Sequence, residues 1–302
     1  MRKINGRLSW WIILIGRIVK NISNEYTVVS DNNEITTLKP RGKFRYLDEN
    51  IKVGDFVEYN ENMILRVLER KNTFLRPFIS NVDYVIIITS LKRPDINYEL
   101  LDKFLINVEM ENVTPIIVIT KMDLGSSDEI KSLYENMKYY EKYYHVFYSN
   151  YEGLVMKDSF LSLMSDKIGV VSGQTGAGKS HLLNTLREDL KLKTQDISDA
   201  LGRGKHTTRH TELLRIENFY IADTPGFSSL DLSYIKSTNL KECFPEFVEV
   251  LNKCKYNECT HTHEPNCIVK ERYEKGLILK SRYDNYLKFY EALKNQERTY
   301  RK

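Results

Sequence analysis

One octapeptide constrains this chain more than any other part of its sequence. Residues 173–180 read GQTGAGKS, which matches the pattern G-x-x-x-x-G-K-S. An apolar run at residues 168–171 precedes it like a buried strand, and residues 181–186 follow it with the composition of a helix. A strand, a glycine loop and a helix in this order predict a phosphate-binding loop. The alternative is a chance glycine turn, which the Lys-Ser ending and these flanks disfavour.

The residues of this loop have separate expected roles toward a nucleoside triphosphate. Lys179 is expected to reach the β- and γ-phosphates, and the Ser180 hydroxyl is expected to bind Mg²⁺. Backbone N–H groups can surround the phosphates because the glycines allow them to point inward. The residues expected to surround the phosphates in this way are Gly173, Gln174, Thr175, Gly176, Ala177 and Gly178.

Length and composition place the chain among soluble multidomain proteins. Its 302 residues allow two or three domains, and 41% hydrophobic with 28% charged residues is ordinary for a globular protein. No apolar run approaches the roughly 20 residues of a membrane span. The apolar run at residues 8–15 is short and lacks a small-residue cleavage site, so it is interpreted as an N-terminal extension leading into a strand.

The first 70 residues contain short β-type runs separated by Asn, Asp and Gly turns. Five such runs predict a small barrel such as an OB-fold. The segment 41–45 (RGKFR) places three cations around an aromatic ring, as OB barrels do where they hold RNA. An ordinary exposed strand explains that segment equally well. The expected strands cover residues 15–22, 25–30, 42–46, 55–59 and 63–68.

Beyond a polar connector the periodicity changes to alternating strands and helices. This alternation predicts a parallel sheet covered on both faces, with ligands at the carboxyl ends of its strands. The expected strands cover residues 82–89, 115–120 and 144–148, and the expected helices cover residues 97–111, 129–142 and 154–164.

A second motif stands at the end of the strand at residues 115–120. It reads Thr120-Lys121-Met122-Asp123. The Asp123 carboxylate can accept hydrogen bonds from guanine N1–H and the 2-amino group together, and the Lys121 stem can cover the base. Adenine would leave that carboxylate unpaired. Alone, the tetrapeptide could simply begin a helix; beside a phosphate loop it predicts a guanine site. Ser149 and Asn150, at the next strand end, are expected to add backbone contacts to the base.

Two segments after the phosphate loop are expected to respond to the γ-phosphate. Residues 202–209 (GRGKHTTR) are rich in glycine, cations and hydroxyls, and Thr207 or Thr208, with Thr208 preferred, is expected to bind Mg²⁺. A strand at residues 220–222 leads into DTPG, in which Asp223 would hold the Mg²⁺ shell and the Gly226 N–H would sense the phosphate. The alternative for DTPG is a simple turn.

Phe227 follows Gly226, where Ras-like enzymes place a glutamine that orients the attacking water. A phenylalanine cannot do this, so slow intrinsic hydrolysis is expected unless another group supplies the orientation. His206 is the nearest candidate, and an ordinary exposed loop histidine is the alternative.

The motif order is also informative. The guanine motif precedes the phosphate loop, whereas it follows the loop in ordinary GTPases. A sheet whose chain ends have moved explains this order, because domain termini often lie close together. The segment from Asp223 to Gly226 then ends the nucleotide domain and leads directly into the C-terminal region.

The C-terminal region contains Cys254, Cys259, His261 and Cys267. Three thiolates and one imidazole suit a closed, structural, tetrahedral Zn²⁺ site with no open catalytic position, in a reducing compartment. The alternatives are His263 in place of His261, or scattered buried cysteines. Cys243 is expected to be a small core residue. The aromatic residues at 283, 286, 289 and 290 have helical spacing, which favours helix packing over base stacking.

Together these features resemble the RsgA (YjeQ) family of small ribosomal subunit biogenesis GTPases, from about residue 15 onward. The resemblance rests on the motif order, on residues 202–209 and 223–226, on the Cys-Cys-His-Cys spacing and on residues 41–45. The expected domains are an OB-fold β-barrel with an N-terminal extension (1–70), a circularly permuted α/β P-loop GTPase domain (71–234) and an α-helical zinc-binding domain (235–302). Thr120 stands where the family usually has Asn.

The resemblance implies a monomeric cytoplasmic protein that binds the small ribosomal subunit and its 16S-type rRNA late in maturation. Particle-stimulated hydrolysis of GTP to GDP and phosphate would be coupled to release. One structural Zn²⁺ and a Mg²⁺ with GTP are implied, with His206 helping to activate water alongside Lys179 and Thr208. Two rival hypotheses are an RNA-binding module that uses GTP as a structural ligand, and a GTP-dependent metal chaperone.

Overall fold

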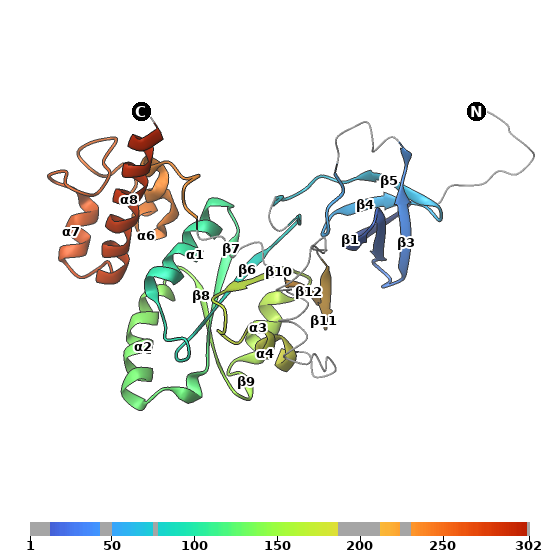
Figure 1. Ribbon diagram of the computed structural model, residues 1–302, viewed down its shortest axis with the longest axis horizontal. Helices are drawn as coiled ribbons and strands as arrows, with labels where there is room; N and C mark the ends of the chain where they lie inside the picture. Colours follow the sequence, from blue (N-terminus) through green and yellow to red (C-terminus); the bar gives the residue numbers. More distant parts are fainter. Residues whose placement is uncertain (1–12, 43–49, 75–77, 187–211, 224–230, 301–302) are drawn as a thin grey trace, which may run out of the picture. The chain divides into compact units, whose positions relative to one another are not determined.

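The computed structural model describes residues 13–42, 50–74, 78–186, 212–223 and 231–300 of the chain (Figure 1). These residues divide into two compact units. One unit holds residues 13–82 and 212–215, and the other holds residues 83–186 and 216–300. None of the helices in the described ranges is long and apolar enough to cross a membrane.

The first unit contains the closed five-stranded barrel that the turn spacing predicts. β1 pairs antiparallel with both β2 and β4, which closes the barrel, and β3 pairs in parallel with β5. Because side chains alternate between the two faces of a strand, one set from each strand fills the interior. Ile18, Val28, Val57 and Ile64 are fully buried there. Around the barrel the order is β1 (Leu14–Ile22), β2 (Glu25–Ser30), β3 (Ile35–Pro40), β5 (Met63–Val67) and β4 (Phe56–Tyr59).

The third strand of the barrel differs from the prediction. It covers Ile35–Pro40, where no strand is expected from the sequence, and residues 43–46 of the strand expected at 42–46 lie outside the described residues. Leu38 pairs with Tyr26 of β2 and is buried, whereas the β-branched residues around it are partly or fully exposed. With one buried side chain in six residues, this strand gives only a weak alternating pattern, and the cation-rich segment after it was the stronger β signal.

The second unit is built on a mostly parallel sheet. The seven-stranded order is β11-β12-β10-β6-β7-β8-β9, and the boundary between the two units falls within β11, after residue 215. β12, β10, β6, β7 and β8 run parallel to one another, so their carboxyl ends share one edge, and β9 is antiparallel to β8. The strands are β6 (Tyr84–Ser90), β7 (Thr114–Thr120), β8 (His145–Asn150), β9 (Gly153–Leu154), β10 (Ile168–Gly173), β11 (Leu213–Ile216) and β12 (Phe219–Asp223).

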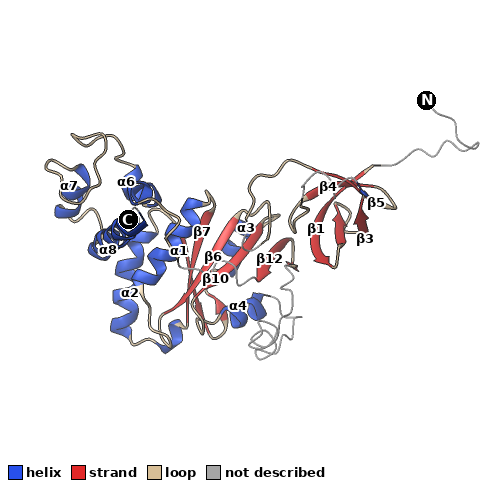
Figure 2. Ribbon diagram, turned by 45° about the horizontal axis from the view of Figure 1, so that its top comes forward, coloured by secondary structure: helices blue, strands red, loops and turns tan. Residues whose placement is uncertain are grey.

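Helices cover both faces of this sheet, as the alternation predicts. α1 (Tyr98–Met110) and α2 (Ser127–Tyr140) lie on one face, and α3 (Lys157–Met164) and α4 (Lys179–Leu186) lie on the other (Figures 1 and 2). Asn97 caps α1 through Leu100 N–H, and Ser126 forms a capping box on α2 with Glu129. The helix expected at residues 154–164 begins three residues later, at Lys157, and its expected first residue, Leu154, lies in β9.

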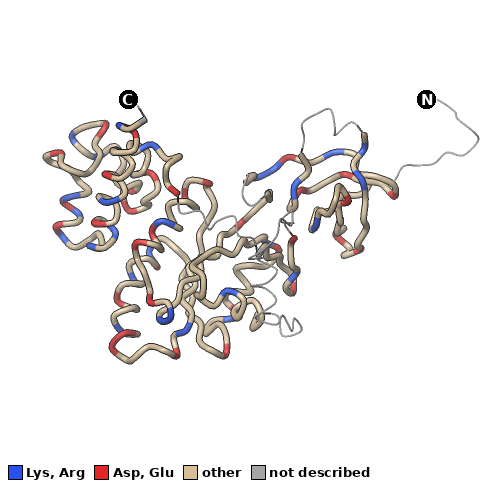
Figure 3. The backbone as a smooth tube through the Cα atoms, in the orientation of Figure 1, with Lys and Arg blue, Asp and Glu red and all other residues tan. Residues whose placement is uncertain are grey.

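The C-terminal region is helical and has its own aromatic core. It contains η4 (Ser237–Cys243), α6 (Pro245–Val248), α7 (Ile268–Glu274) and α8 (Lys280–Tyr300). The aromatic rings of α8 pack into this core, since Tyr283, Tyr286, Phe289 and Tyr290 are each at most 5% exposed. This confirms helix packing rather than base stacking. Figure 3 shows charges of both signs interspersed along α8.

Candidate nucleotide site and metal centre

The phosphate loop lies where the sheet predicts, between β10 and α4. Gly173 ends β10 with a φ of +133°, and a Cβ there would stand 2.0 Å from the carbonyl oxygen of Ile88 in β6. Only glycine fits this position, because both the backbone conformation and the neighbouring strand exclude a side chain. The Lys179 ammonium donates to the carbonyl oxygens of Gly173 (3.0 Å) and Gln174 (2.9 Å). The lysine therefore lies across the loop that it is expected to serve.

The guanine motif contacts this loop directly, although more than fifty residues separate the two in sequence. Thr120, at the end of β7, donates its hydroxyl hydrogen to the carbonyl oxygen of Ala177. Lys121 donates from Nζ to the carbonyl oxygen of Gly176 (2.7 Å) and also to that of Arg93. The structure thus brings together the two motifs whose reversed order in the chain suggested a permuted domain.

The side chains of the guanine motif differ in exposure because its backbone turns sharply. Lys121 has a φ of +57° and precedes the 3₁₀ turn η2 (Met122–Leu124). Met122 is buried, whereas Asp123 is exposed. Asp123 is thus exposed two residues after Lys121, which contacts the phosphate loop, and its role toward a base stays a prediction.

Ser149 and Asn150 end β8 at the same edge of the sheet. Ser149 is 1% exposed. The Asn150 side-chain oxygen accepts hydrogen bonds from the backbone N–H groups of Glu152 (2.9 Å) and Gly153 (3.2 Å). That side-chain oxygen shapes the turn into β9.

The residues expected around Mg²⁺ are described only in part. Ser180 lies in the first turn of α4, next to Lys179. The backbone of Asp223 ends β12 and pairs in register with Val171 of β10, two residues before the phosphate loop begins. His206, Thr207, Thr208 and Gly226 lie outside the described residues, as does Phe227.

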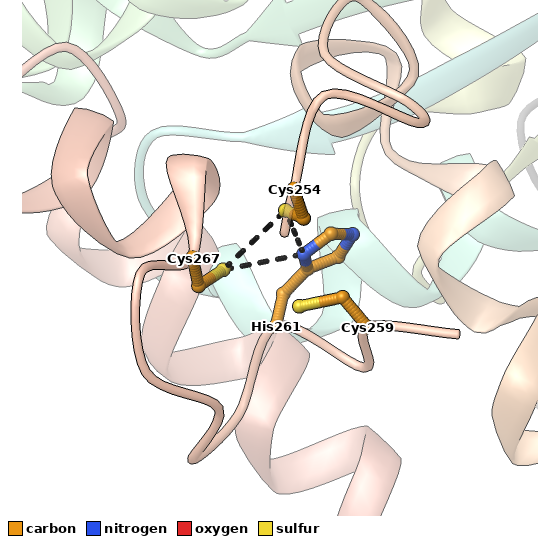
Figure 4. A group of neighbouring side chains, drawn as sticks. All are labelled: Cys254, Cys259, His261 and Cys267. Atoms are coloured by element: carbon orange, nitrogen blue, oxygen red, sulfur yellow. Dashed lines mark hydrogen bonds between the residues drawn. The ribbon is translucent and has the colours of Figure 1, made fainter. Parts of the chain in front are cut away.

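Four metal-ligand side chains converge in the C-terminal region (Figure 4). One ligand atom from each of Cys254, Cys259, His261 and Cys267 lies within 4.8 Å of all the others. His261 Nδ1 lies 3.6 Å from Cys254 Sγ and 3.3 Å from Cys267 Sγ, and the two sulfur atoms are 4.0 Å apart. Zn–S bonds of about 2.3 Å in a tetrahedron give S···S edges of about 3.8 Å, so the group fits a tetrahedral ion.

The structure also chooses between the two histidines. His261 is buried and directs Nδ1 at the thiols, whereas His263 is exposed and contacts Thr262. Burial, helped by the charge of Lys241, lowers the pKa of His261 to about 4, which leaves the neutral imidazole that metals bind. Burial also raises the pKa of Cys259 to about 12, so a cation is the natural partner for a thiolate at this position.

Side chains from other elements hold the ligand loop. Tyr283 and Tyr286 of α8 donate their hydroxyls to the carbonyl oxygens of His261 and Thr260. Lys241 of η4 donates to the carbonyl oxygen of Cys259 (3.1 Å). These bonds fix the backbone on both sides of the imidazole, which a closed structural site requires.

A buried ion cluster, which sequence reasoning missed, joins this region to the nucleotide domain. The Arg282 guanidinium of α8 donates to Asp102 of α1 (2.8 Å) and, with two nitrogens, to Glu246 of α6 (2.8 and 3.0 Å). All three residues are 0% exposed. Tyr140 and Asn285 also donate to Asp102. The sequence does carry one signal, because Arg282 has helical spacing with the apolar residues of α8. A lone arginine at such a position is normally interpreted as exposed to solvent.

Comparisons with known proteins agree with this arrangement. Residues 15–63 match the family model of the RsgA N-terminal domain, and residues 67–233 match that of the RsgA GTPase. The chain is 44% identical over 296 residues to "Small ribosomal subunit biogenesis GTPase RsgA" of Streptococcus agalactiae, covering 95% of this chain and 98% of that relative. The protein of the same name from Streptococcus pneumoniae is 42% identical over 296 residues, covering 95% and 97%.

Two solved structures share the fold. The crystal structure of YjeQ from Thermotoga maritima is 34% identical, with a TM-score of 0.82 over 93% of this chain and 99% of that one. The structure of YloQ, described as a circularly permuted GTPase, is 31% identical, with a TM-score of 0.82 over 96% and 99%. The chain therefore belongs to the RsgA family of circularly permuted GTPases, which hydrolyse GTP.

Proposed function

We propose that this chain binds the small ribosomal subunit late in its maturation and hydrolyses GTP there as a timing switch. The ribosomal particle stimulates hydrolysis, and hydrolysis is coupled to release. The proposal is supported by two relatives of 42% and 44% identity that carry the name small ribosomal subunit biogenesis GTPase and match over nearly their whole length. We further propose that the protein acts as a cytoplasmic monomer, with domains at 1–70, 71–234 and 235–302.

The nucleotide lies between the phosphate loop and the guanine motif. Lys179 neutralises charge on the β- and γ-phosphates, and Asp123 selects guanine through its N1–H and 2-amino group. The observation that carries this assignment is the pair of hydrogen bonds from Thr120 to Ala177 and from Lys121 to Gly176, since they join the two motifs at one edge of the sheet.

Ser180, Asp223 and Thr207 or Thr208 form the proposed Mg²⁺ shell. When bound, Mg²⁺ neutralises charge that develops as the γ-phosphoryl group leaves. The Gly226 N–H senses that group, and His206 helps to orient the attacking water. Leu232 and Ile235 follow Gly226 closely in sequence and are buried in the same core as Cys259 and Cys267. The segment that feels the γ-phosphate therefore leads directly into the metal-bound region.

The four-residue cluster at Cys254, Cys259, His261 and Cys267 holds one structural Zn²⁺. The four side chains would supply all the ligands of a tetrahedral ion, so the ion would organise the C-terminal region and take no part in the hydrolysis. The barrel contributes contacts to 16S-type rRNA. The exposed Arg41 follows β3 and lines a hollow of about 340 Å³ together with Asn60 and Met63, which offers a cation beside polar and apolar groups.

The decisive experiment is co-sedimentation of the protein with separated ribosomal subunits. The expected result is retention on the small subunit with a non-hydrolysable GTP analogue and release with GDP. The GTPase rate is measured in parallel with and without small subunits, and a rate indifferent to the particle would contradict the ribosomal part alone.

A second function, an RNA-binding module that holds GTP as a structural ligand, is favoured by Phe227 in place of a water-orienting glutamine. The two proposals differ in turnover. If every ribosomal particle leaves hydrolysis negligible, while Lys179→Ala abolishes nucleotide binding, the second function is supported. A GTP-dependent metal chaperone requires an exchangeable ion, and zinc that resists mild chelators would exclude it.

A further inference from the structure

An exposed tyrosine that has no role in the proposed function stands at the end of the guanine side of the site. Tyr151 directly follows Asn150 and is 77% exposed. Its ring stacks on the His181 imidazole, with centroids 5.3 Å apart and an interplanar angle of 25°. His181 Nε2 lies 2.8 Å from the Tyr151 carbonyl oxygen. A carbonyl oxygen can only accept, so Nε2 carries the hydrogen in this contact.

Neighbouring contacts hold this pair in place. The Asn150 side chain accepts from the N–H groups of Glu152 and Gly153, which folds the segment into a tight turn. Gly153 has a φ of +125°, and a Cβ there would stand 3.3 Å from the Thr185 side chain. Thr185 lies four residues after His181, on the same face of α4. The turn between β8 and β9 therefore lies along the helix that begins in the phosphate loop.

The two residues of the pair lie next to different parts of the proposed nucleotide site. Tyr151 follows the segment expected to contact the base, and His181 follows Ser180, which is expected to serve the phosphates and their Mg²⁺. Lys121 and Thr120 tie the phosphate loop to the end of β7. The Tyr151–His181 pair is the corresponding tie between the phosphate-loop helix and the end of β8.

We propose that Tyr151 and His181 are positioning residues that fix the spacing between the base end and the phosphate end of the nucleotide site. This inference rests on the proposed placement of the nucleotide. A ligand that spans both ends gains from a fixed spacing, because the ordering has been completed before binding. A ligand that occupies only one end gains nothing. The pair therefore acts on guanine nucleotides as whole molecules and raises their affinity.

The test compares ligands of different reach on the full chain. Binding of fluorescent mant-GDP is measured directly, and guanosine and inorganic pyrophosphate are measured by competition. Tyr151→Ala is expected to weaken mant-GDP by about threefold to tenfold, which is the range for loss of one aromatic pair. Guanosine and pyrophosphate are expected to change by less than about twofold. Tyr151→Phe keeps the ring and the backbone carbonyl, so this variant is expected to bind mant-GDP with wild-type affinity.

A double-mutant cycle with His181→Ala checks that the two residues act as one unit. The double variant is expected to lose no more affinity for mant-GDP than the single variant that binds it less tightly. Tyr134→Ala is the matched control, because the partly exposed Tyr134 also packs on a tyrosine of β8, with centroids 4.8 Å apart, but is not paired with His181.

Three results would overturn the inference: wild-type mant-GDP affinity in Tyr151→Ala, additive losses in the cycle, or an equal loss for guanosine alone. Failure of the proposed nucleotide placement looks different. In that case the wild-type protein does not bind mant-GDP, or Lys179→Ala leaves its binding unchanged. Wild-type binding that Lys179→Ala abolishes and Tyr151→Ala leaves intact would contradict the inference alone.

Discussion

Thr120 ties the guanine motif to the phosphate loop with one hydroxyl. Its Oγ1 contacts the carbonyl oxygen of Ala177 closely and that of Thr89 at 3.3 Å. A hydroxyl has one hydrogen to donate, so the bond to Ala177 dominates. The residue is 4% exposed. Thr120 therefore connects the end of β7 with the phosphate loop through its hydroxyl group.

Replacing Thr120 by valine keeps the shape of the side chain and removes this donor. The buried carbonyl oxygen of Ala177 then loses a partner, which costs about 1–3 kcal/mol. Thr120→Val is expected to weaken GDP binding by about tenfold, and Thr120→Ser, which retains the hydroxyl, by much less. Isothermal titration of GDP into the two variants measures the difference, and equal affinities for both would show that the hydroxyl has no such role.

Asp123 is the residue on which we expect base specificity to depend. In Asp123→Asn the side-chain amide presents an N–H group to the guanine donors, so GDP is expected to bind about tenfold to hundredfold more weakly. Xanthosine diphosphate carries an oxygen at the 2-position and is expected to gain affinity. Competition of the two nucleotides for each protein gives both numbers. Asp95→Asn is the control, because Asp95 is another exposed carboxylate of this domain.

At the scale of elements, α1 and α8 are joined by one buried ion pair and one exposed ion pair. Arg282 and Asp102 are buried, and burial raises the pKa of Asp102 although Arg282 and several hydrogen bonds oppose that shift. Farther along α8, Lys288 pairs with Glu99 of α1 at 2.6 Å, and the Lys288 side chain is 63% exposed. Desolvated and solvated ion pairs on the same two helices can therefore be compared directly.

Removing Arg282 is expected to be far more costly than removing Lys288. Arg282→Met leaves two buried carboxylates unpaired, which typically costs about 3–5 kcal/mol, whereas Lys288→Met breaks a surface pair worth about 0–1 kcal/mol. Urea unfolding followed by circular dichroism gives both free energies. The triple variant Arg282→Met, Asp102→Asn, Glu246→Gln removes the unpaired charges and is expected to recover most of the loss. Without that recovery, the cost would lie in packing and not in charge.

The elements predicted from the sequence are those with strong local signals. The strand before the phosphate loop and helix α1 were predicted to within about a turn, because continuous apolar runs and helical spacing depend only on local residues. β11 and the third barrel strand were missed, since neither buries its side chains in a continuous run or a regular alternation. The Arg282 cluster could not be predicted, because its partners are 36 and 180 residues away and no local pattern links them.

The same limit applies to the candidate site. Motif chemistry predicts the phosphate loop, the guanine motif and the four candidate metal ligands, because each set is defined by residue type and spacing. The Tyr151–His181 pair carries no such pattern, and only the packing of the β8–β9 turn on α4 brings the two rings together. The hydrogen bonds from Thr120 and Lys121 to the phosphate loop likewise depend on strand order in space.

At the scale of the whole molecule, the candidate metal ligands share a core with the nucleotide domain. Cys259 and Cys267 belong to the same buried cluster as Ile106 of α1 and Tyr139 of α2. Residues 83–186 and 216–300 also form one compact unit. Loosening the ligand loop would therefore remove packing from helices that cover the sheet, and the C-terminal region and the nucleotide domain should unfold together.

Metal removal tests this expectation. A strong chelator acting on the full chain is expected to release one Zn²⁺ per molecule and to lower Tm by about 10 °C, because an ion bound only by the folded state stabilises it. The nucleotide domain and the C-terminal region are expected to unfold together in one calorimetric transition, both before and after chelation. His261→Ala is expected to reproduce the loss of bound zinc, whereas His263→Ala, which alters an exposed imidazole two residues away, should keep full stoichiometry. If the C-terminal region melts separately while the GDP-stabilised transition is unmoved, the shared core does not couple the two, and the ion stabilises its own loop alone.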